Sequence, residues 1–391
     1  MPPALLLFFL LGTAASEKIV SCYVRPGIPP ASKIDAFLCT HLMIIGPAGL
    51  NDDGTARLPA KKVLEPIVAL KKQNPRLKVF LTLLPKNPVM SALVTNAPLM
   101  ETFVANVTTF LEAEDLDGFD LDWEFPVWNG APSDREGLSA LLRALRSAFD
   151  ASPRPLGLSL AVSAPFTITK KAYDVAIMNY DFHFFSKTTP FTGLNAPLRA
   201  LKYEILVLKK LNSVASLSLS SSPTFFRPSP LPSGSLADSP YGSSSSAFRP
   251  TGAVSGFSLT SSIYPTPPPW ASPTASETLS PSLRLSLLKK SRNLVFAVQV
   301  CAALNSSEFS LEWSDRAASP YFHGARQWVS FEDVRSVTAK AAFAKELDAR
   351  GIMLFDLAND DFEAKCALGA TYPLIRAAKK TFLSPLAVQE H

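Results

Sequence analysis

Residues 117–126 read Asp-Gly-Phe-Asp-Leu-Asp-Trp-Glu-Phe-Pro, and this stretch decides the fold of the chain. Successive side chains of a β-strand point to opposite faces, so Asp120, Asp122 and Glu124 would share one face of a strand. The other face is apolar and can pack beneath helices; it carries Phe119, Leu121, Trp123 and Phe125. Like charges at close range raise each other's pKa, which suits a carboxyl group to proton donation near neutral pH. From spacing alone, catalysis, a cation site and a solvent-exposed strand end all stay open.

The same segment resembles the signature of the glycoside hydrolase family 18 chitinases and their chitinase-like relatives, Asp-Gly-x-Asp-x-Asp-Trp-Glu-[Tyr/Phe]-Pro. Every acidic position of that signature is present, as Asp117, Asp120, Asp122 and Glu124. The resemblance implies an α/β fold, a (β/α)8 TIM barrel with a small α+β insertion. It also implies a glycosidase that acts on chitin or chito-oligosaccharides and needs neither cofactor nor metal.

The composition fits a secreted protein with one large domain. A chain of 391 residues can form one barrel with an insertion, so its length does not demand two domains. The net charge of +5 is scattered rather than gathered into basic patches with aromatic residues, which argues against nucleic acid as a partner. Residues 1–16 hold an apolar run, Leu5 to Leu11, followed by small residues, and we expect a signal peptide there. No later segment is predicted to span a membrane.

Secretion through an oxidising compartment favours disulfides between the four cysteines, Cys22, Cys39, Cys301 and Cys366. The sequence alone allows three pairings, and four free thiols are the alternative. The family resemblance implies Cys22–Cys39 and Cys301–Cys366. Two sequons, at Asn106 and Asn305, are candidate glycosylation sites.

Up to about residue 200 the chain alternates strand-like and helix-like segments, as a parallel barrel requires. Most strand-like segments are near-continuous apolar runs, which suits strands buried on both faces. They cover 19–23, 37–45, 78–84, 118–124, 156–163 and 173–180. Helices are predicted over 60–73 and 133–151, the second opened by a Ser133-x-x-Glu136 capping box. After residue 315 we expect a helix from Ser330-x-x-Asp333 to about Arg350, ended by Gly351, and a strand over 352–357.

Residues 206–296 do not follow this pattern. They are rich in Ser and Pro and lack hydrophobic periodicity, and repeated prolines exclude central strands and helix interiors. In the resembling family this interval supplies the seventh barrel strand and most of the insertion. Two explanations are open: a genuine disordered insertion, or a frameshift or mis-spliced exon, which we favour. We therefore assign 17–205 and 297–380 to the barrel, 206–296 to a low-complexity segment, and 381–391 to a tail.

The resemblance also implies roles for the acidic strand. Hydrolysis would be retaining, with the N-acetyl group of the substrate as nucleophile. Glu124 would protonate the glycosidic oxygen and then activate water. Asp122 would hold the acetamido group, and Asp120 would share a proton with Asp122, so that the pair titrates as a unit. Asp117 and Gly118 are expected to be structural.

A second segment, 178–182, resembles the Met-x-Tyr-Asp strand end of the family. Tyr180 would donate its hydroxyl to the acetamido carbonyl, Asp181 would contact the same sugar, and Met178 would form an apolar wall. Ordinary packing is the alternative reading of this pentapeptide. The predicted sugar-binding set also includes three aromatic residues, Tyr23, Trp123 and Phe355.

Some positions depart from the family pattern. Leu84 and Pro85 stand where a turn of the family usually carries glycines, so we expect an altered or narrower cleft. Phe355 stands where a tryptophan usually lies beneath the scissile sugar, with less area and no indole N–H. These changes favour a chito-oligosaccharide-binding, lectin-like or growth-factor-like protein that hydrolyses little. The retained Glu124 favours a secreted chitinase, which we expect.

Overall fold

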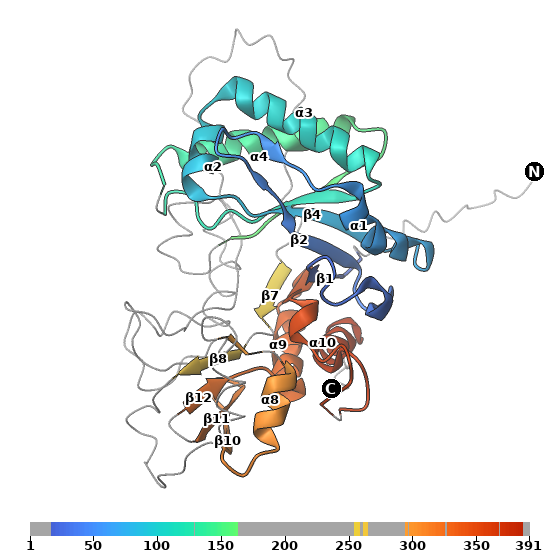
Figure 1. The fold of residues 1–391 in the computed structure, drawn as a ribbon, viewed down its shortest axis with the longest axis vertical. Coiled ribbons are helices and arrows are strands. Elements are labelled where there is room, and N and C mark those ends of the chain that lie inside the picture. The colour runs from blue at the N-terminus through green and yellow to red at the C-terminus, as the bar shows by residue number, and fades with distance from the viewer. Residues whose placement is uncertain are drawn as a thin grey trace, which may run out of the picture.

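The computed structural model describes residues 17–128, 130–162, 254–258, 261–264, 294–295, 297–324, 327–366 and 368–385. These residues form two β-sheets and the helices that pack on them (Figure 1). The expected signal peptide and the predicted strand 173–180 lie outside the described residues.

The main sheet is parallel, with the strand order β6-β5-β4-β2-β1-β13-β7. Its strands are β1 (Ile19–Val24), β2 (His41–Leu50), β4 (Lys78–Leu83), β5 (Gly118–Leu121), β6 (Gly157–Leu160), β7 (Val254–Ser258) and β13 (Gly351–Phe355). A short strand, β3 (Ala56–Arg57), pairs antiparallel with the end of β2. The first strand of the chain, β1, pairs with β13 near its end, as a barrel requires.

In the part of the chain that the structure describes, six α-helices accompany these strands. They are α1 (Lys61–Val68), α2 (Asn87–Val94), α3 (Ala97–Ala113), α4 (Asp134–Ala151), α9 (Val334–Glu346) and α10 (Pro373–Leu383). Figure 1 shows α1 to α4 gathered around β2 and β4, with α9 and α10 together at the other end of the sheet. Among the described residues, no helix combines the length and apolar character needed to cross a membrane.

Alternation along the strands sorts the apolar side chains into two layers. Outward-facing residues such as Val20, Leu81 and Phe119 belong to the large core beneath the helices. Inward-facing residues form a smaller cluster inside the barrel, made of Tyr23, Met43, Ile45 and Phe80, with Met353 and Phe355 packed against it. Asp120 of β5 faces the same way, so the inner cluster lies next to the first of the acidic residues.

Two glycines make room for the ring of Phe80 inside the barrel. A Cβ on Gly118 would lie 2.6 Å from that ring and 2.5 Å from the carbonyl oxygen of Gly157. A Cβ on Gly157 would collide with the same ring. Close packing at this level therefore gives Gly118 a physical reason to be glycine.

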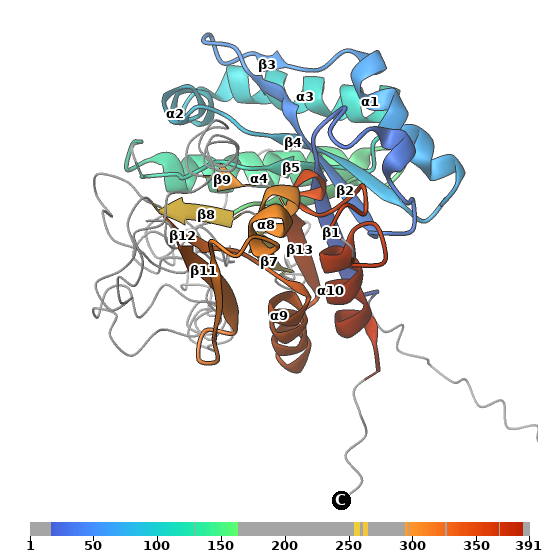
Figure 2. The ribbon, with the colours of Figure 1, turned by 60° about the horizontal axis from the view of Figure 1, so that its bottom comes forward.

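A second, antiparallel sheet forms the small α+β insertion, with the strand order β10-β11-β12-β8-β9. Its strands are β8 (Ser261–Tyr264), β9 (Leu294–Val295), β10 (Ser310–Ser314), β11 (Ser319–Gly324) and β12 (Gln327–Ser330). Helix α8 (Ala297–Leu304) shares a core with this sheet, made of Val300, Ala303, Phe322, Val329 and Phe331. Figure 2 shows the sheet and α8 at one side of the main sheet.

Both disulfides have the pairing that the family resemblance implies. Cys22 of β1 is bonded to Cys39, just before β2. Cys301 of α8 is bonded to Cys366, which follows β13. The second bond ties the insertion to the barrel covalently.

Residues 206–296 contribute more structure than the sequence predicted. β7 pairs in parallel with β13, and β8 pairs with β12. β7 stands at the end of the described sheet order, next to β13, so a strand forms at residues 254–258 although the interval is rich in proline. The physical reason is local: residues 254–264 contain no proline, although Pro250 and Pro265 flank them closely.

Helix α4 begins where the sequence predicts it, with Ser133 at the N-cap, but the Ser133 side chain makes no capping hydrogen bond. The start and the end of α9 differ from the prediction. The residue that caps α9 is Asp333, not Ser330, and it forms a capping box with Ser336. Gly351 lies inside β13 and does not end α9, which stops at Glu346.

Candidate active site

Asp120 is the most deeply buried of the three carboxyl groups on the inner face, at 2% exposure. Three hydroxyl groups donate to it from three other strands. Tyr23 Oη and Thr82 Oγ1 lie 2.8 and 3.0 Å from Oδ2, and Ser159 Oγ lies 2.6 Å from Oδ1. Burial raises the pKa of Asp120, and the three hydrogen bonds oppose that rise. Asp120 is therefore held in one orientation at the centre of the barrel.

Asp122 comes next on the same face, directly after β5, and is 7% exposed. Its backbone N–H donates to the carbonyl of Leu83 at 2.9 Å, which continues the pairing of β5 with β4. Its Oδ1 is buried and accepts no hydrogen bond from the described residues. Burial, followed by the charges of Glu124 and Asp120, raises the pKa of Asp122 to about 8. The pKa of Asp122 therefore lies well above that of an ordinary carboxyl group, which favours the protonated form near neutral pH.

Glu124 is exposed at the mouth of the barrel. Its carbonyl oxygen accepts a hydrogen bond from Asn87 Nδ2 at 3.0 Å, which ties this part of the chain to the start of α2. Burial thus decreases from Asp120 through Asp122 to Glu124. A protonated, buried carboxyl group behind an exposed one is the kind of arrangement that acid–base catalysis uses.

An aromatic surface lies beside these carboxyl groups. The ring of Phe355, at the end of β13, has its centroid 5.3 Å from that of Tyr23. Because the hydroxyl of Tyr23 donates to Asp120, the aromatic pair and the acidic strand form one continuous surface. The guanidinium carbon of Arg25 also lies 5.4 Å from the centroid of the Phe355 ring.

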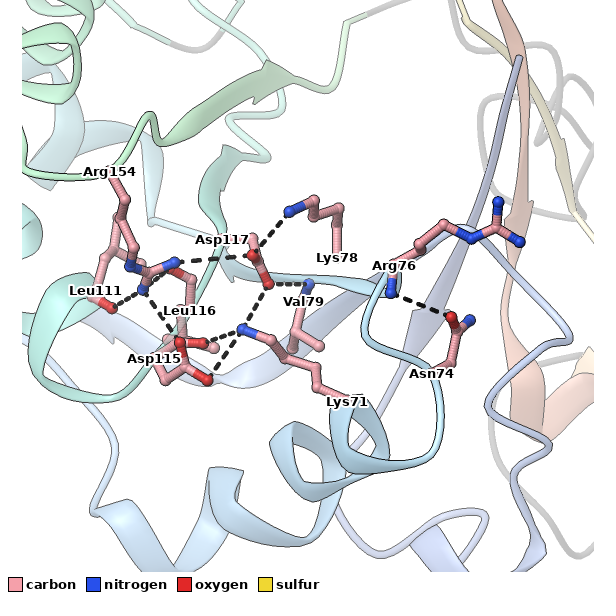
Figure 3. Close-up of polar contacts among 10 residues, drawn as sticks. All are labelled: Lys71, Asn74, Arg76, Lys78, Val79, Leu111, Asp115, Leu116, Asp117 and Arg154. Atoms are coloured by element: carbon pink, nitrogen blue, oxygen red, sulfur yellow. Dashed lines mark hydrogen bonds and ion pairs between the residues drawn. The ribbon is translucent and has the colours of Figure 1, made fainter. Parts of the chain in front are cut away.

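Asp117 lies at the opposite end of β5, among the cations drawn in Figure 3. Its Oδ2 accepts a hydrogen bond from the Val79 N–H at 2.9 Å and lies 3.0 Å from Lys71 Nζ. Lys78 Nζ and Arg154 Nη1 approach Oδ1 at 3.3 and 3.7 Å. In (β/α)8 barrels the active site lies at the C-terminal ends of the strands, and residues at the N-terminal ends contribute to stability. The contacts of Asp117 are those of a structural residue.

The sequence model of the glycosyl hydrolases family 18 matches residues 18–229 and 242–360. The chain belongs to this family. The match extends over residues 206–229 and 242–296, which we assigned to the low-complexity segment.

Two curated relatives illustrate the range of the family. Chitotriosidase-1 of Mus musculus is 27% identical over 378 residues, which cover 90% of this family 18 chain and 74% of the relative. Probable chitinase 2 of Drosophila melanogaster is 29% identical over 422 residues, which cover 94% of this chain and 80% of the relative.

Solved structures confirm the predicted (β/α)8 barrel. The Group IV chitinase of Ostrinia furnacalis superposes with a TM-score of 0.74 at 24% identity, covering 94% of this chain and all of that one. Human YKL-39, whose structure is described as that of a pseudo-chitinase with retained chitooligosaccharide-binding properties, gives a TM-score of 0.74 at 22% identity, with 94% and 100% covered. Family 18 folds of this kind therefore include both a chitinase and a pseudo-chitinase.

Trp123, for which we predicted a sugar contact, lies on the side of this family 18 barrel that faces away from the acidic residues. Its side chain is fully buried in the outer core beneath the helices. Its indole Nε1 donates to Asn87 Oδ1 at 2.7 Å. Strand alternation gives the physical reason, because Trp123 points away from the face that carries Asp122 and Glu124.

The loop after the acidic strand contains residues that the sequence analysis missed. Val127 has a positive φ of 65°, which is rare for a β-branched residue. The fully buried Asp134 holds it there, since its Oδ2 accepts hydrogen bonds from the N–H groups of Val127 and Ala131 at 3.0 Å each. Asn87 Nδ2 also reaches the carbonyl of Trp128 at 3.5 Å, and the Trp128 side chain is 55% exposed. Asn87 and Asp134 stand at helix starts, where such residues are common, so no pattern singled them out.

The two residues that replace the turn glycines of the family lie at the mouth. Leu84 directly follows β4 and is 47% exposed, whereas Pro85 is buried. In the β4–β5 register Leu83 is opposite Leu121, so Leu84 follows opposite Asp122. Its side chain therefore adds apolar bulk to the rim beside the acidic face.

The remaining predicted residues divide into two groups. Met178, Tyr180 and Asp181 lie outside the described residues. Asn106, on α3, and Asn305, directly after α8, are both exposed. Among the described residues, no cluster of three His, Cys, Asp or Glu side chains is placed to hold a metal ion.

Proposed function

We propose that this family 18 protein is a secreted hydrolase that cleaves β-1,4-linked N-acetylglucosamine chains with retention of configuration. One observation carries the proposal: Asp120, Asp122 and Glu124 form a series of decreasing burial, and the pKa of Asp122 is raised to about 8. In this series Asp120 would serve as the fixed base, Asp122 as the group that holds a proton, and Glu124 as the exposed acid.

In the proposed reaction the substrate supplies its own nucleophile. Glu124 donates its proton to the glycosidic oxygen, and the C1–O bond breaks. The acetamido carbonyl oxygen attacks C1 and forms an oxazolinium ion. As the proton shared by the pair shifts from Asp122 to Asp120, the Asp122 carboxylate accepts a hydrogen bond from the acetamido N–H and balances the charge that develops there. Glu124, now a carboxylate, takes a proton from water as the water opens the ring, which restores the acid.

Asp120 would control the proton that Asp122 carries. The two groups are coupled, since the charge of Asp120 contributes to the raised pKa of Asp122. Hydroxyl donors from Tyr23, Thr82 and Ser159 stabilise the ionised form of Asp120. The pair should therefore titrate together as one unit.

The substrate platform is proposed from both described and undescribed parts of the chain. Phe355 and Tyr23 would lie beneath the sugar that is cleaved, because their rings adjoin Asp120. Tyr180, Asp181 and Met178 keep their predicted roles around the acetamido group. The chito-oligosaccharide ligands of YKL-39 support chitin fragments as the substrate class.

Secretion is part of the proposal and rests on three features. The two disulfides are typical of proteins that fold in an oxidising compartment. Residues 1–16 have the pattern of a signal peptide. The sequons at Asn106 and Asn305 lie at exposed positions, where glycan attachment is possible.

A second candidate function is that of a chito-oligosaccharide-binding protein with little hydrolysis. The observation that favours it is the altered rim and floor of the site. Leu84 occupies the mouth, and Phe355 offers less stacking area than the tryptophan of the family pattern. Such a protein would bind the same ligands and release them uncut.

Turnover of a fluorogenic N-acetylchitobioside by the purified protein separates the two candidates. The hydrolase predicts release of the fluorophore, and the Glu124→Gln variant is expected to lose at least about a hundredfold of that rate, in line with the loss of a general acid. The variant should still bind N-acetylchitotetraose, measured by calorimetry. Binding without turnover in both proteins would favour the second candidate, and full turnover by Glu124→Gln would exclude Glu124 as the acid.

A further inference from the structure

Asp356 is a buried carboxylate, directly after β13, that the proposed reaction does not use. It directly follows Phe355 and its side chain is fully buried. Its Oδ1 accepts hydrogen bonds from the backbone and side-chain N–H groups of Asn359, at 3.2 and 2.8 Å. Its Oδ2 lies 2.7 Å from Arg25 Nη1. Burial raises the pKa of Asp356, and the charge of Arg25 is the largest opposing influence.

Arg25 reaches Asp356 from the neighbouring strand, just past the end of β1. It follows Tyr23 at a spacing of two residues, so both residues face the same way. The Arg25 side chain is 43% exposed, and its guanidinium carbon lies 5.4 Å from the centroid of the Phe355 ring. One guanidinium group therefore contacts a buried anion and an aromatic ring, on a side chain that is partly exposed to solvent.

We propose that Arg25 and Phe355 together form a composite sugar platform, with Asp356 as the anchor that fixes it. This inference rests on the proposed function, because it assigns the platform to the sugar beside Asp120. The guanidinium plane extends the flat area of the phenyl ring. It also brings N–H donors to the edge of that ring, which a phenyl group lacks.

The chemistry of the three residues explains why arginine suits this position. A guanidinium group is planar, always charged and carries five N–H donors, of which the contact with Asp356 uses only part. It stacks on aromatic rings and pairs with a carboxylate at the same time. The remaining donors can bond to hydroxyl or acetamido oxygens of a neutral sugar. The ligand class is therefore an N-acetylated sugar chain that stacks one ring on Phe355.

Calorimetry with N-acetylchitotetraose tests the inference in the Glu124→Gln background, which prevents turnover. Adding Arg25→Gln is expected to weaken binding by about two- to tenfold, the range of one net hydrogen bond to the sugar. Arg25→Lys keeps the charge but loses the plane and should fall between the two. Arg335→Gln is the matched control, since Arg335 lies 3.7 Å from the Trp313 ring and 3.4 Å from Asp315 in the insertion. It should leave affinity unchanged.

The double variant Arg25→Gln and Asp356→Asn distinguishes two causes of weaker binding: loss of the sugar contacts of Arg25, and destabilisation by an unpaired Asp356 carboxylate. It leaves no unpaired carboxylate, so its thermal stability should recover relative to Arg25→Gln, while its affinity should stay low. If the double variant regains affinity together with stability, the inference is overturned. Unchanged binding by Arg25→Gln would also overturn it. So would tighter binding, which would mean that Arg25 covers the Phe355 ring. If the Glu124→Gln background alone fails to bind, the proposed function fails and the platform with it. Should Arg25→Gln not fold, the double variant decides the question by itself.

Discussion

Asp122 is the residue at which protonation and stability are most closely linked. Its pKa rises from 3.8 to about 8 on folding, so the folded protein binds this proton more tightly than the unfolded chain does. The stability that this proton contributes is fully present below pH 3.8 and is lost as the pH rises through 8. Burial of Asp122 as a carboxylate therefore costs stability in alkaline solution.

Replacing Asp122 with Asn should raise the melting temperature at pH 9, because the amide stays neutral. The expected gain is about 2–4 °C for each kcal/mol of recovered stability, and it should shrink toward pH 5. Circular dichroism at pH 5, 7 and 9 measures this, with the exposed Asp52→Asn as control. The same variant is expected to lose hydrolysis. A gain that does not change with pH would contradict a raised pKa at Asp122.

The residue-scale features of the site differ in how far the sequence could predict them. Strand alternation was sufficient to place Asp120, Asp122 and Glu124 on one face. It also placed Trp123 on the other, so its proposed sugar contact conflicted with its own position. The partners of these residues were out of reach. The Asp120 donors come from three other strands, and the contact between Arg25 and Asp356 joins residues more than 300 positions apart in the chain.

At the scale of elements, the loop between β5 and α4 depends on Asp134. This buried carboxylate holds the N–H groups of Val127 and Ala131, and Val127 keeps a left-handed backbone. Asp134→Ala should lower the free energy of unfolding by about 1–3 kcal/mol, since two buried donors lose their acceptor. It should also lower activity, because the loop leads directly from Glu124. Val127→Gly is the matched control and should retain activity, as glycine tolerates positive φ.

Chemical denaturation and the chitobioside assay together measure both effects. An Asp134→Ala protein with normal stability and rate would show that the loop is fixed by other contacts. Element boundaries were also the weaker part of the sequence prediction. The helix period identified α4 and α9. The Ser133 side chain does not cap α4, and Asp333 rather than Ser330 caps α9. Tertiary contacts decide which of several polar residues caps a helix start.

At the scale of the whole molecule, the Cys301–Cys366 bond holds the insertion to the barrel. It closes a loop with a sequence separation of 65, for which chain entropy gives about 4 kcal/mol of stabilisation. Changing both cysteines to serine should lower stability by up to about that amount. The matched pair Cys22 and Cys39, separated by 17, should have a smaller effect of about 3 kcal/mol. Urea unfolding of the two double variants compares them, and equal losses would contradict the loop-length account.

The overall architecture followed from the sequence more readily than its middle did. Alternating apolar runs and the acidic signature were enough to predict the barrel. The strand at 254–258 was missed because its short apolar segment lies between prolines, and only its pairing with β13 identifies it as part of the sheet. Long-range pairing of this kind leaves little trace in local composition.

The ring of Phe80, fitted against Gly118 and Gly157, gives the described part of the barrel a closed base. The described strands are therefore filled by side chains at this level, as close packing requires. Under the proposed function, sugar and water would reach Asp120 from the end of the strands that leads to Asp122 and Glu124. The cut chain and the water that restores the acid would then use the same end of the barrel, so slow release of product would also delay the return of the proton to Glu124.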